Sequence, residues 1–197
     1  MEHLTGGTIG SPPAELVGPR VCVRRIEERD APAVFAATEE ARAHLAPWMH
    51  WPRHHRTLEE TKATLRNDHL RWLHRDHFSM GIFDGAEGTF LGSIALGVEE
   101  ARIPSFDLSY WIRPDAEGRG YVSEAVRLVT ACAFDHLGAH RVAIYCDPRN
   151  TRSARVAERL GFAFEGRLRQ DALTPDGAVR DTLAFAMVRA DYERTRG

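Results

Sequence analysis

Apolar residues along the chain change their spacing several times, and each change indicates a different element. Short segments in which apolar residues alternate or run together predict strands, whereas apolar residues that recur every three or four positions predict helices. The order of the segments indicates an α+β fold, with about four helices on the faces of a central, mostly antiparallel, twisted mixed sheet of about seven strands. We expect strands over residues 21–26, 77–83, 89–98, 106–112, 141–146, 162–168 and 182–188, and helices over 30–46, 57–73, 121–137 and 150–160.

Polar residues at the starts of three of these helices support their boundaries. Asp30 has the residue type of an N-cap, and Pro32 follows it in the first helical turn. Thr57 and Glu60 have the spacing of a capping box, and Asn150 is suited to cap the last predicted helix. The helix that begins near residue 121 follows a loop with two glycines instead.

That loop belongs to the stretch Y-W-I-R-P-D-A-E-G-R-G-Y-V-S-E-A, residues 110–125, which has the order strand, loop, helix. Gly118 and Gly120 flank Arg119 directly before the helix. Backbone N–H groups at a helix start have no partner within the helix, and the helix dipole favours negative charge there. The stretch therefore suits a phosphate or pyrophosphate group, although a strand-to-helix turn that simply needs glycine explains the same residues.

The composition is that of one ordinary globular domain. The chain has 197 residues, 43% hydrophobic and 27% charged, and its net charge of −2 gives no general reason to expect nucleic acid or an anionic membrane as a partner. Three separated cysteines without a Cys-x-x-Cys pair suit reduced thiols in a cytoplasmic protein. We find no signal peptide and no apolar run near the ~20 residues of a membrane span. Residues 1–19, rich in Gly and Pro, predict a flexible arm before a single domain over 20–197.

Residues 45–56 are unusually aromatic and basic for a loop. The run L-A-P-W-M-H-W-P, with Trp48 and Trp51, fits either a wall of a binding site or a loop that lies under the core. The next four residues, R-H-H-R, fit a solvated loop. His74 and His77 are three residues apart, but no third ligand stands at a suitable spacing, so we expect no metal site.

Taken together, these motifs resemble the GNAT superfamily of N-acetyltransferases, and within it the RimJ/RimL type, which acetylates the N-terminal amine of ribosomal proteins. The resemblance covers residues 21–189. It is carried by the stretch at 110–125, by N-T-R-S-A-R-V-A-E-R-L-G-F at 150–162, by L-A-P-W-M-H-W, and by G-A-V-R-D-T-L-A-F-A-M at 177–187. It implies a GNAT fold, acetyl-CoA as co-substrate, a primary amine as acceptor, a cytoplasmic location and possible homodimers.

The resemblance also assigns cofactor-binding roles. In the family, the strand before the glycine loop splays from its neighbour and binds the pantetheine arm through its backbone, and the loop binds the pyrophosphate. The superfamily motif Q/R-x-x-G-x-G/A keeps its glycine at Gly120, but Glu117 and Val122 depart from it. A carboxylate at Glu117 repels a pyrophosphate unless it points to solvent. The implied cofactor-binding residues are Trp111, Ile112, Arg113, Gly118, Arg119, Gly120, Tyr121, Val122, Ser123, Asn150 and Ser153.

Catalytic roles follow from what acyl transfer to an amine requires. Many superfamily members protonate the leaving thiolate with a Tyr whose place is taken here by Ala157, so we assign thiolate stabilisation to Ser153, one turn earlier. Asp107 is the candidate base, with Glu99 and Glu100 as the next choices. Tyr110 is expected on the opposite strand face, in the core. For acceptor binding we single out Trp48, Trp51 and Glu99.

The acceptor itself is left open by the sequence. An α-amine has a pKa of ~7.7–8.0 and lysine one of ~10.4, which favours an α-amine because less base catalysis is needed. Residues 45–56 and 171–181 are expected to shape the acceptor pocket. The alternatives are another acyl donor such as succinyl-CoA, an antibiotic or polyamine acceptor, or a non-catalytic domain that binds acyl-CoA for regulation.

Overall fold

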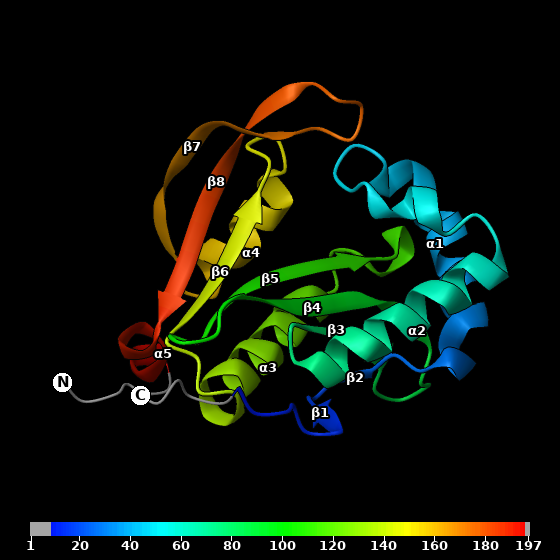
Figure 1. Cartoon of the computed structure of the whole chain (residues 1–197), viewed down its shortest axis with the longest axis horizontal. Coiled ribbons are helices and arrows are strands. Elements are labelled where there is room, and N and C mark those ends of the chain that lie inside the picture. The colour runs from blue at the N-terminus through cyan, green and yellow to red at the C-terminus, as the bar shows by residue number, and fades with distance from the viewer. Residues whose placement is uncertain (1–8, 196–197) are drawn as a thin grey trace.

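The computed structural model describes residues 9–195, which form one eight-stranded sheet with helices on both faces (Figure 1). The strand order is β1-β2-β3-β4-β5-β6-β8-β7, and every neighbouring pair except β5–β6 is antiparallel among the strands described. The strands are β1 Glu15–Val17, β2 Val21–Arg25, β3 His77–Asp84, β4 Phe90–Glu100, β5 Ser105–Ile112, β6 Arg141–Cys146, β7 Ala163–Leu173 and β8 Val179–Val188.

Two hydrophobic clusters, one on each face, hold the helices to this sheet. The larger contains Phe106 and Leu108 of β5 with the apolar side of α3. The smaller joins Trp111 of β5 to α1 and α2. Figure 1 shows α1 and α2 together at one end of the sheet and α4 beside β6. The helices are α1 Ala31–Leu45, α2 Leu58–His74, α3 Tyr121–His136, α4 Thr151–Arg159 and α5 Arg189–Thr195, with short 3-10 turns η1 Glu28–Asp30, η2 Trp51–His54 and η3 Pro114–Ala116.

The predicted mixed, mostly antiparallel sheet is confirmed, with one more strand and one more helix than expected. The additional strand, β1, lies in the segment expected to be a loose arm, and it pairs Glu15 with Arg24 of β2. Ile9 is also buried, in the larger cluster. The prediction of a flexible arm is therefore wrong for these residues, whereas the part that concerns residues 1–8 lies outside the described residues. The additional helix is α5.

Two of the three predicted helix caps are present. The Asn150 side chain accepts a hydrogen bond from the N–H of Ser153 at 3.1 Å, and Thr57 accepts one from the N–H of Glu60 at 3.1 Å. The capping box is incomplete, because the carboxylate of Glu60 accepts from the N–H of Arg56 rather than from that of Thr57. Asp30 does not cap α1: its carboxylate binds the guanidinium of Arg24 at two points instead.

The parallel pair β5–β6 is short, and it determines where a ligand can enter the sheet. In the described residues, the two strands pair only through Ser105–Asp107 and Arg141–Ala143. Beyond these, β5 continues beside β4 and β6 continues beside β8, so the two strands separate (Figure 1). The splay expected from the resemblance is thus present, and it leaves edge backbone groups of β5 without a neighbouring strand.

Candidate active site

The glycine loop between β5 and α3 has the backbone conformation of an anion site. Gly118 and Gly120 have φ values of 73° and 81°, in the left-handed region that favours glycine. Gly120 occupies the N-cap position of α3, and no side chain caps this helix. The first N–H groups of α3 therefore remain available, and the helix dipole adds positive potential at the same place.

An ion pair with one buried partner, between the exposed Arg20 and the buried Glu124, fixes this loop from the side of β2. Arg20 donates through Nη1 to the carbonyl of Arg119 at 2.6 Å and through Nε to Glu124 at 2.9 Å. Glu124 is 3% exposed and also accepts from the N–H groups of Arg20 and Val21. Burial raises the pKa of its carboxyl, but these hydrogen bonds outweigh burial and hold the pKa below its usual value. Sequence reasoning missed Arg20, because no local pattern links residues about a hundred positions apart.

Glu117, the residue that departs from the family motif, is paired rather than directed to solvent. One of its carboxylate oxygens lies 2.9 Å from Nε2 of His44 in α1, and the other accepts from Arg152 in α4. Because Arg152 is positively charged, it compensates the carboxylate whose repulsion of a pyrophosphate was the concern. The loop is thereby linked to α1 on one side and to α4 on the other.

The remaining predicted residues of the loop and helix have varied surroundings. The hydroxyl of Tyr121 donates to Asp84 at 3.3 Å. Ser123 is buried, and its hydroxyl accepts from Arg159 of α4 at 3.3 Å. Val122 packs partly buried against the larger cluster. At this helix start the backbone of Tyr121, Val122 and Ser123, rather than their side chains, is placed to bind an anion.

At the strand before the loop, the backbone of Arg113 already has hydrogen-bond partners within the protein. The N–H of Arg113 donates to the carbonyl of Leu91 at 2.8 Å, and the Arg113 carbonyl accepts from Ala116 at 3.1 Å. The N–H of Arg113 is thus used within the protein, whereas its carbonyl oxygen has a second lone pair that could still accept from a pantetheine amide. Trp111 and Ile112 precede this point and belong to the part of β5 that has separated from β6.

Ser153 meets Tyr110 and Cys146 where β5 and β6 separate. The hydroxyl oxygens of Ser153 and Tyr110 are 2.9 Å apart, and the Tyr110 hydroxyl also lies 3.3 Å from the carbonyl of Ser153. Burial raises the pKa of Cys146, and a hydrogen bond with Ser153 opposes this. Burial also raises the pKa of Tyr110 to about 12, so its phenol stays protonated. The ring of Tyr110 packs against the core as expected, but its hydroxyl belongs to the site, and sequence reasoning missed that.

Asp107 lies on the other face of β5. Residues 107 and 110 are an odd number of positions apart, so their side chains point to opposite faces of the strand. Burial, followed by the negative charge of Glu99, raises the pKa of Asp107. Its neighbour on β4 is Gly97, where a Cβ atom would lie only 2.1 Å from an Asp107 carboxylate oxygen. Glycine at 97 therefore makes room for this carboxylate.

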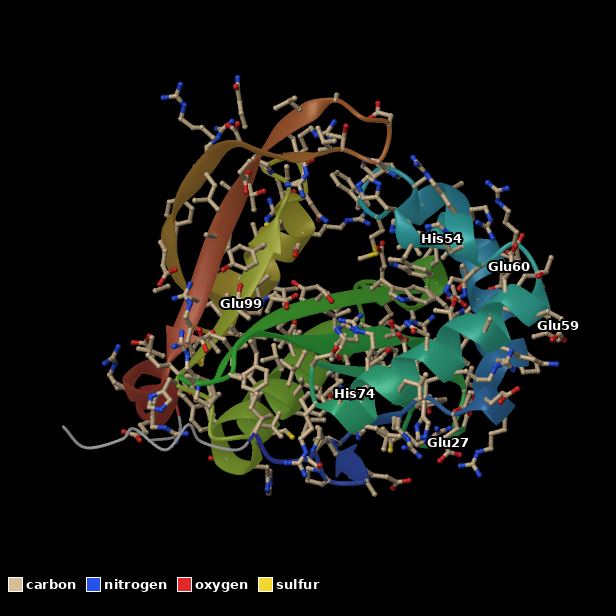
Figure 2. The ribbon with its side chains drawn as sticks, in the orientation of Figure 1. Glu27, His54, Glu59, Glu60, His74 and Glu99 are labelled. Carbon is tan, nitrogen blue, oxygen red and sulfur yellow. The ribbon has the colours of Figure 1, made fainter. Side chains whose placement is uncertain are left out.

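Glu99 extends the acidic side of the site towards β6. Figure 2 shows its side chain near β6, close to where β5 and β6 separate. A hydrogen bond with Glu99 raises the pKa of Tyr145 on β6, after the larger effect of burial. Asp107 and Glu99 together give this face of the opening a negative potential, which suits a cationic or polar amine.

The two segments expected to shape the acceptor pocket lie against one another. Trp51 packs on Trp111 with ring centroids 5.3 Å apart, and the guanidinium of Arg149 lies 5.9 Å from the ring centre of Trp48. Arg53 donates to the carbonyl of Pro175, which ties the first segment to the turn between β7 and β8. The aromatic run therefore forms part of a wall beside the opening as well as part of the smaller core.

The R-H-H-R segment is only partly the solvated loop that was expected. His55 is 5% exposed and hydrogen-bonded to Thr61 at 3.1 Å. His54 projects outward near Glu60 (Figure 2). A shallow depression of about 530 Å³ is lined here by Arg53, His54, Arg56, Glu60 and Ala63.

Metal sites and membrane-spanning helices are both absent from residues 9–195. Within that range, no three or more His, Cys, Asp or Glu side chains are placed to share a metal ion. None of the helices described there is both long and apolar enough to cross a membrane.

The sheet opens beside an uncapped helix start, and a free strand edge leads inward from it. This arrangement fits a ligand in which an extended arm is attached to a pyrophosphate. Acyl-CoA has this shape, and the arrangement defines the class of CoA-dependent acyltransferases. Comparison with known proteins agrees. The chain belongs to the acetyltransferase (GNAT) domain family, whose sequence pattern matches residues 20–163. It is thus an acyltransferase that uses acetyl-CoA, and not a domain that only binds it.

Named relatives lie within the expected branch. The [ribosomal protein uS5]-alanine N-acetyltransferase of Escherichia coli (strain K12) is 27% identical over 184 residues, which cover 92% of this chain and 94% of that protein. RimJ of Mycobacterium smegmatis, solved with a CoA disulfide, has a TM-score of 0.80 and 26% identity over 97% of this chain and 91% of its own. RimL, a ribosomal L7/L12 α-N-protein acetyltransferase solved with coenzyme A, has a TM-score of 0.82 at 21% identity, covering 88% and 97% of the two chains.

Proposed function

We propose that this enzyme transfers an acetyl group from acetyl-CoA to the α-amine of a protein N-terminus, of the ribosomal-protein type. The observation that carries the proposal is the two-sided arrangement of β5. This strand directs Asp107 to one face, beside the aromatic wall, and Tyr110 with Ser153 to the other. A thioester lying between β5 and β6 would expose its carbonyl carbon to an amine on the first face and its sulfur to hydroxyl groups on the second.

The residues that would hold acetyl-CoA fall into two groups. The backbone of Gly118 to Ser123 would bind the pyrophosphate, with Arg20 keeping the loop in place. The free edge of β5 up to Ile112 would hydrogen-bond the pantetheine amides, because it has no neighbouring strand there. Asn150 contributes by fixing the first turn of α4, which carries Ser153.

The chemistry then needs a neutral amine and a stabilised leaving group. The amine nitrogen attacks the thioester carbonyl carbon and gives up a proton to the Asp107 carboxylate, directly or through water. The C–S bond breaks, its electron pair stays on sulfur, and the Ser153 hydroxyl donates a hydrogen bond to the new thiolate. The raised pKa of Asp107 makes it a stronger base than an ordinary carboxylate, although an α-amine needs little assistance.

An amine panel tests this proposal. Purified enzyme is mixed with acetyl-CoA, and free thiol is measured with peptides that have a free N-terminus and no lysine, or a blocked N-terminus and one lysine. We expect rapid release only with free N-termini, and mass spectrometry should place the acetyl group on the α-nitrogen. Faster acetylation of lysine, a polyamine or an aminoglycoside would overturn the acceptor assignment. Faster reaction with succinyl-CoA would overturn the assignment of the donor.

Such an acceptor accords with the cytoplasmic location expected for a protein with reduced cysteines, and the cysteines described here are unpaired. The homodimer suggested by the resemblance stays a prediction.

A further inference from the structure

The contact between Tyr110 and Ser153 has a function beyond packing. We propose that Tyr110 is a positioning residue that donates its hydroxyl proton to Ser153 and thereby directs the Ser153 proton towards the departing sulfur. This inference rests on the role proposed above for Ser153. It concerns a residue of β5 that lies 43 positions from Ser153 in the sequence.

The two hydroxyl groups differ in what their protons can do. Each has one proton, and their oxygens are 2.9 Å apart, so one of them donates to the other. The alternative acceptor for Tyr110, the Ser153 carbonyl, is more distant at 3.3 Å. If Tyr110 donates to Ser153, the serine proton can go to a third partner, which is the Cys146 sulfur that already has a hydrogen bond with Ser153 or, during turnover, the departing sulfur. If Ser153 donates to Tyr110, that proton is lost to the reaction.

The surroundings favour Tyr110 as the donor during turnover. Burial raises the pKa of Tyr110 to about 12, so the phenol does not ionise at neutral pH. A serine hydroxyl that already accepts one hydrogen bond becomes a better donor, because chains of hydrogen bonds polarise one another. A donor oriented in advance also needs no reorganisation when negative charge develops on the sulfur. The departing thiolate therefore meets a serine proton already directed towards it.

The raised pKa of Tyr110 also excludes it as the source of the proton that sulfur finally receives. A thiol has a pKa of ~8.5, well below that of Tyr110, so the phenol would not transfer its proton to the thiolate. Its contribution is orientation, and the proton that finally reaches sulfur comes from solvent. Ala157, where many relatives have a tyrosine, lies one turn beyond Ser153 on the same helix face and is fully buried. The phenol of Tyr110 on β5 thus helps to stabilise the leaving group, because α4 has no tyrosine at position 157.

A double-mutant cycle tests the proposal in the full-length enzyme. Tyr110→Phe removes the hydroxyl and keeps the ring. We expect it to lower the single-turnover rate of acetyl transfer about 5- to 20-fold, while the Kd for acetyl-CoA, measured by calorimetry, changes less than about twofold. Ser153→Ala should lower the rate at least as much. In the Ser153→Ala enzyme, Tyr110→Phe should add less than a twofold effect, because the proton it orients is already gone.

Tyr192→Phe is the matched control. Tyr192 lies on α5, away from the opening, and its buried hydroxyl donates to Asp135 at the end of α3 at 2.8 Å. The substitution therefore reports the cost of losing such a bond without touching the opening. Its single-turnover rate should match that of the original enzyme. Additive effects of Tyr110→Phe and Ser153→Ala, or a Tyr110→Phe enzyme with an unchanged rate, would overturn the proposal.

The outcomes also separate this inference from the proposed function. If the unmodified enzyme transfers acetyl to α-amines and the cycle is additive, only the role of Tyr110 fails. If Ser153→Ala has the original rate, the roles of both residues fail while the acceptor assignment stands. Thermal melting of each variant, with assays run well below the lowest midpoint, ensures that the rates refer to folded protein.

Discussion

The two sides of the opening between β5 and β6 are held in different ways. On the cofactor side, the glycine loop owes its shape to two positive-φ glycines and to a buried carboxylate that binds β2 and, through Arg20, the loop. On the acceptor side, arginine side chains hold residues 46–57 in place. Arg42 of α1 donates to the carbonyls of Pro52 and His55 within this segment, and Arg53 donates from it to the carbonyl of Pro175.

This difference suits what each side must recognise. A pyrophosphate has one shape in every catalytic cycle, so backbone N–H groups fixed by the fold can bind it without adjustment. An acceptor chain is longer and more variable, and it meets a wall made of side chains and loops. Substitutions on the cofactor side should therefore abolish the binding of acetyl-CoA. Substitutions on the acceptor side should weaken acceptor binding only partly.

The largest expected effect is that of Gly120→Glu. A side chain at φ 81° is strained by about 1–2 kcal/mol, its Cβ would lie 3.0 Å from the guanidinium of Arg20, and the carboxylate would repel the pyrophosphate. Binding of acetyl-CoA, measured by calorimetry, should weaken by at least about 100-fold. Gly138→Glu is the control, because Gly138 has a φ of 72° with no atom within 4 Å of its Cβ position. Retained tight binding in Gly120→Glu would refute the pyrophosphate assignment.

The next effect concerns Asp107→Asn, which should lower kcat by about 10²-fold with little change in acetyl-CoA affinity. The folded protein disfavours the charged form of this residue, since burial and Glu99 raise its pKa above the unfolded value. The carboxylate thus costs stability as the pH rises past its unfolded pKa, and the amide removes that cost, so the melting temperature should not fall at pH 7.

The pH profile sharpens the same test. If Asp107 is the base, kcat/KM falls as the pH drops through its raised pKa, because the protonated carboxyl cannot accept a proton. Glu99→Gln should shift this acidic limb to lower pH, because it removes a charge that raises the pKa of Asp107. A limb that stays in place would show that a different group controls it.

The smallest effect is expected for Arg42→Gln. Losing the guanidinium frees the carbonyls of Pro52 and His55, which should loosen the acceptor wall and raise the KM for a peptide acceptor about three- to tenfold. The KM for acetyl-CoA should be unchanged. Arg66→Gln is the control, because Arg66 forms an exposed ion pair with Glu28. A parallel rise in both KM values would contradict the separation of the two sides.

The sequence predicts those parts of the fold that depend on local spacing. The strand at 141–146 and the capping roles of Thr57 and Asn150 follow from neighbours within a few residues, and the structure confirms them. The strand β1 could not be predicted, because three residues are too few to show an alternation of apolar and polar positions. The glycines and prolines around it also indicate a loose chain.

The contacts that complete the site were not predictable in the same way. Arg20 with Glu124, Glu117 with Arg152, and Tyr110 with Ser153 join distant segments, and each partner has an ordinary local role that explains it equally well. Tyr110 shows this best: strand alternation correctly places its ring in the core, but only the packing of α4 brings a hydroxyl to its far end. The backbone partners of Arg113 were not predictable for a related reason, since they form only when the loop closes.

The short ladder between β5 and β6 has one more consequence. Among residues 9–195, three residue pairs join β1–β5 to β6–β8 within the sheet. The amides of a bound pantetheine arm would supply hydrogen bonds that are missing between β5 and β6, so acetyl-CoA would connect the two halves of the sheet as well as react. When CoA leaves at the end of each turnover, this connection would be lost. With this placement of acetyl-CoA, the two halves of the sheet would be joined best when the donor is bound, and donor binding would raise the free energy of unfolding.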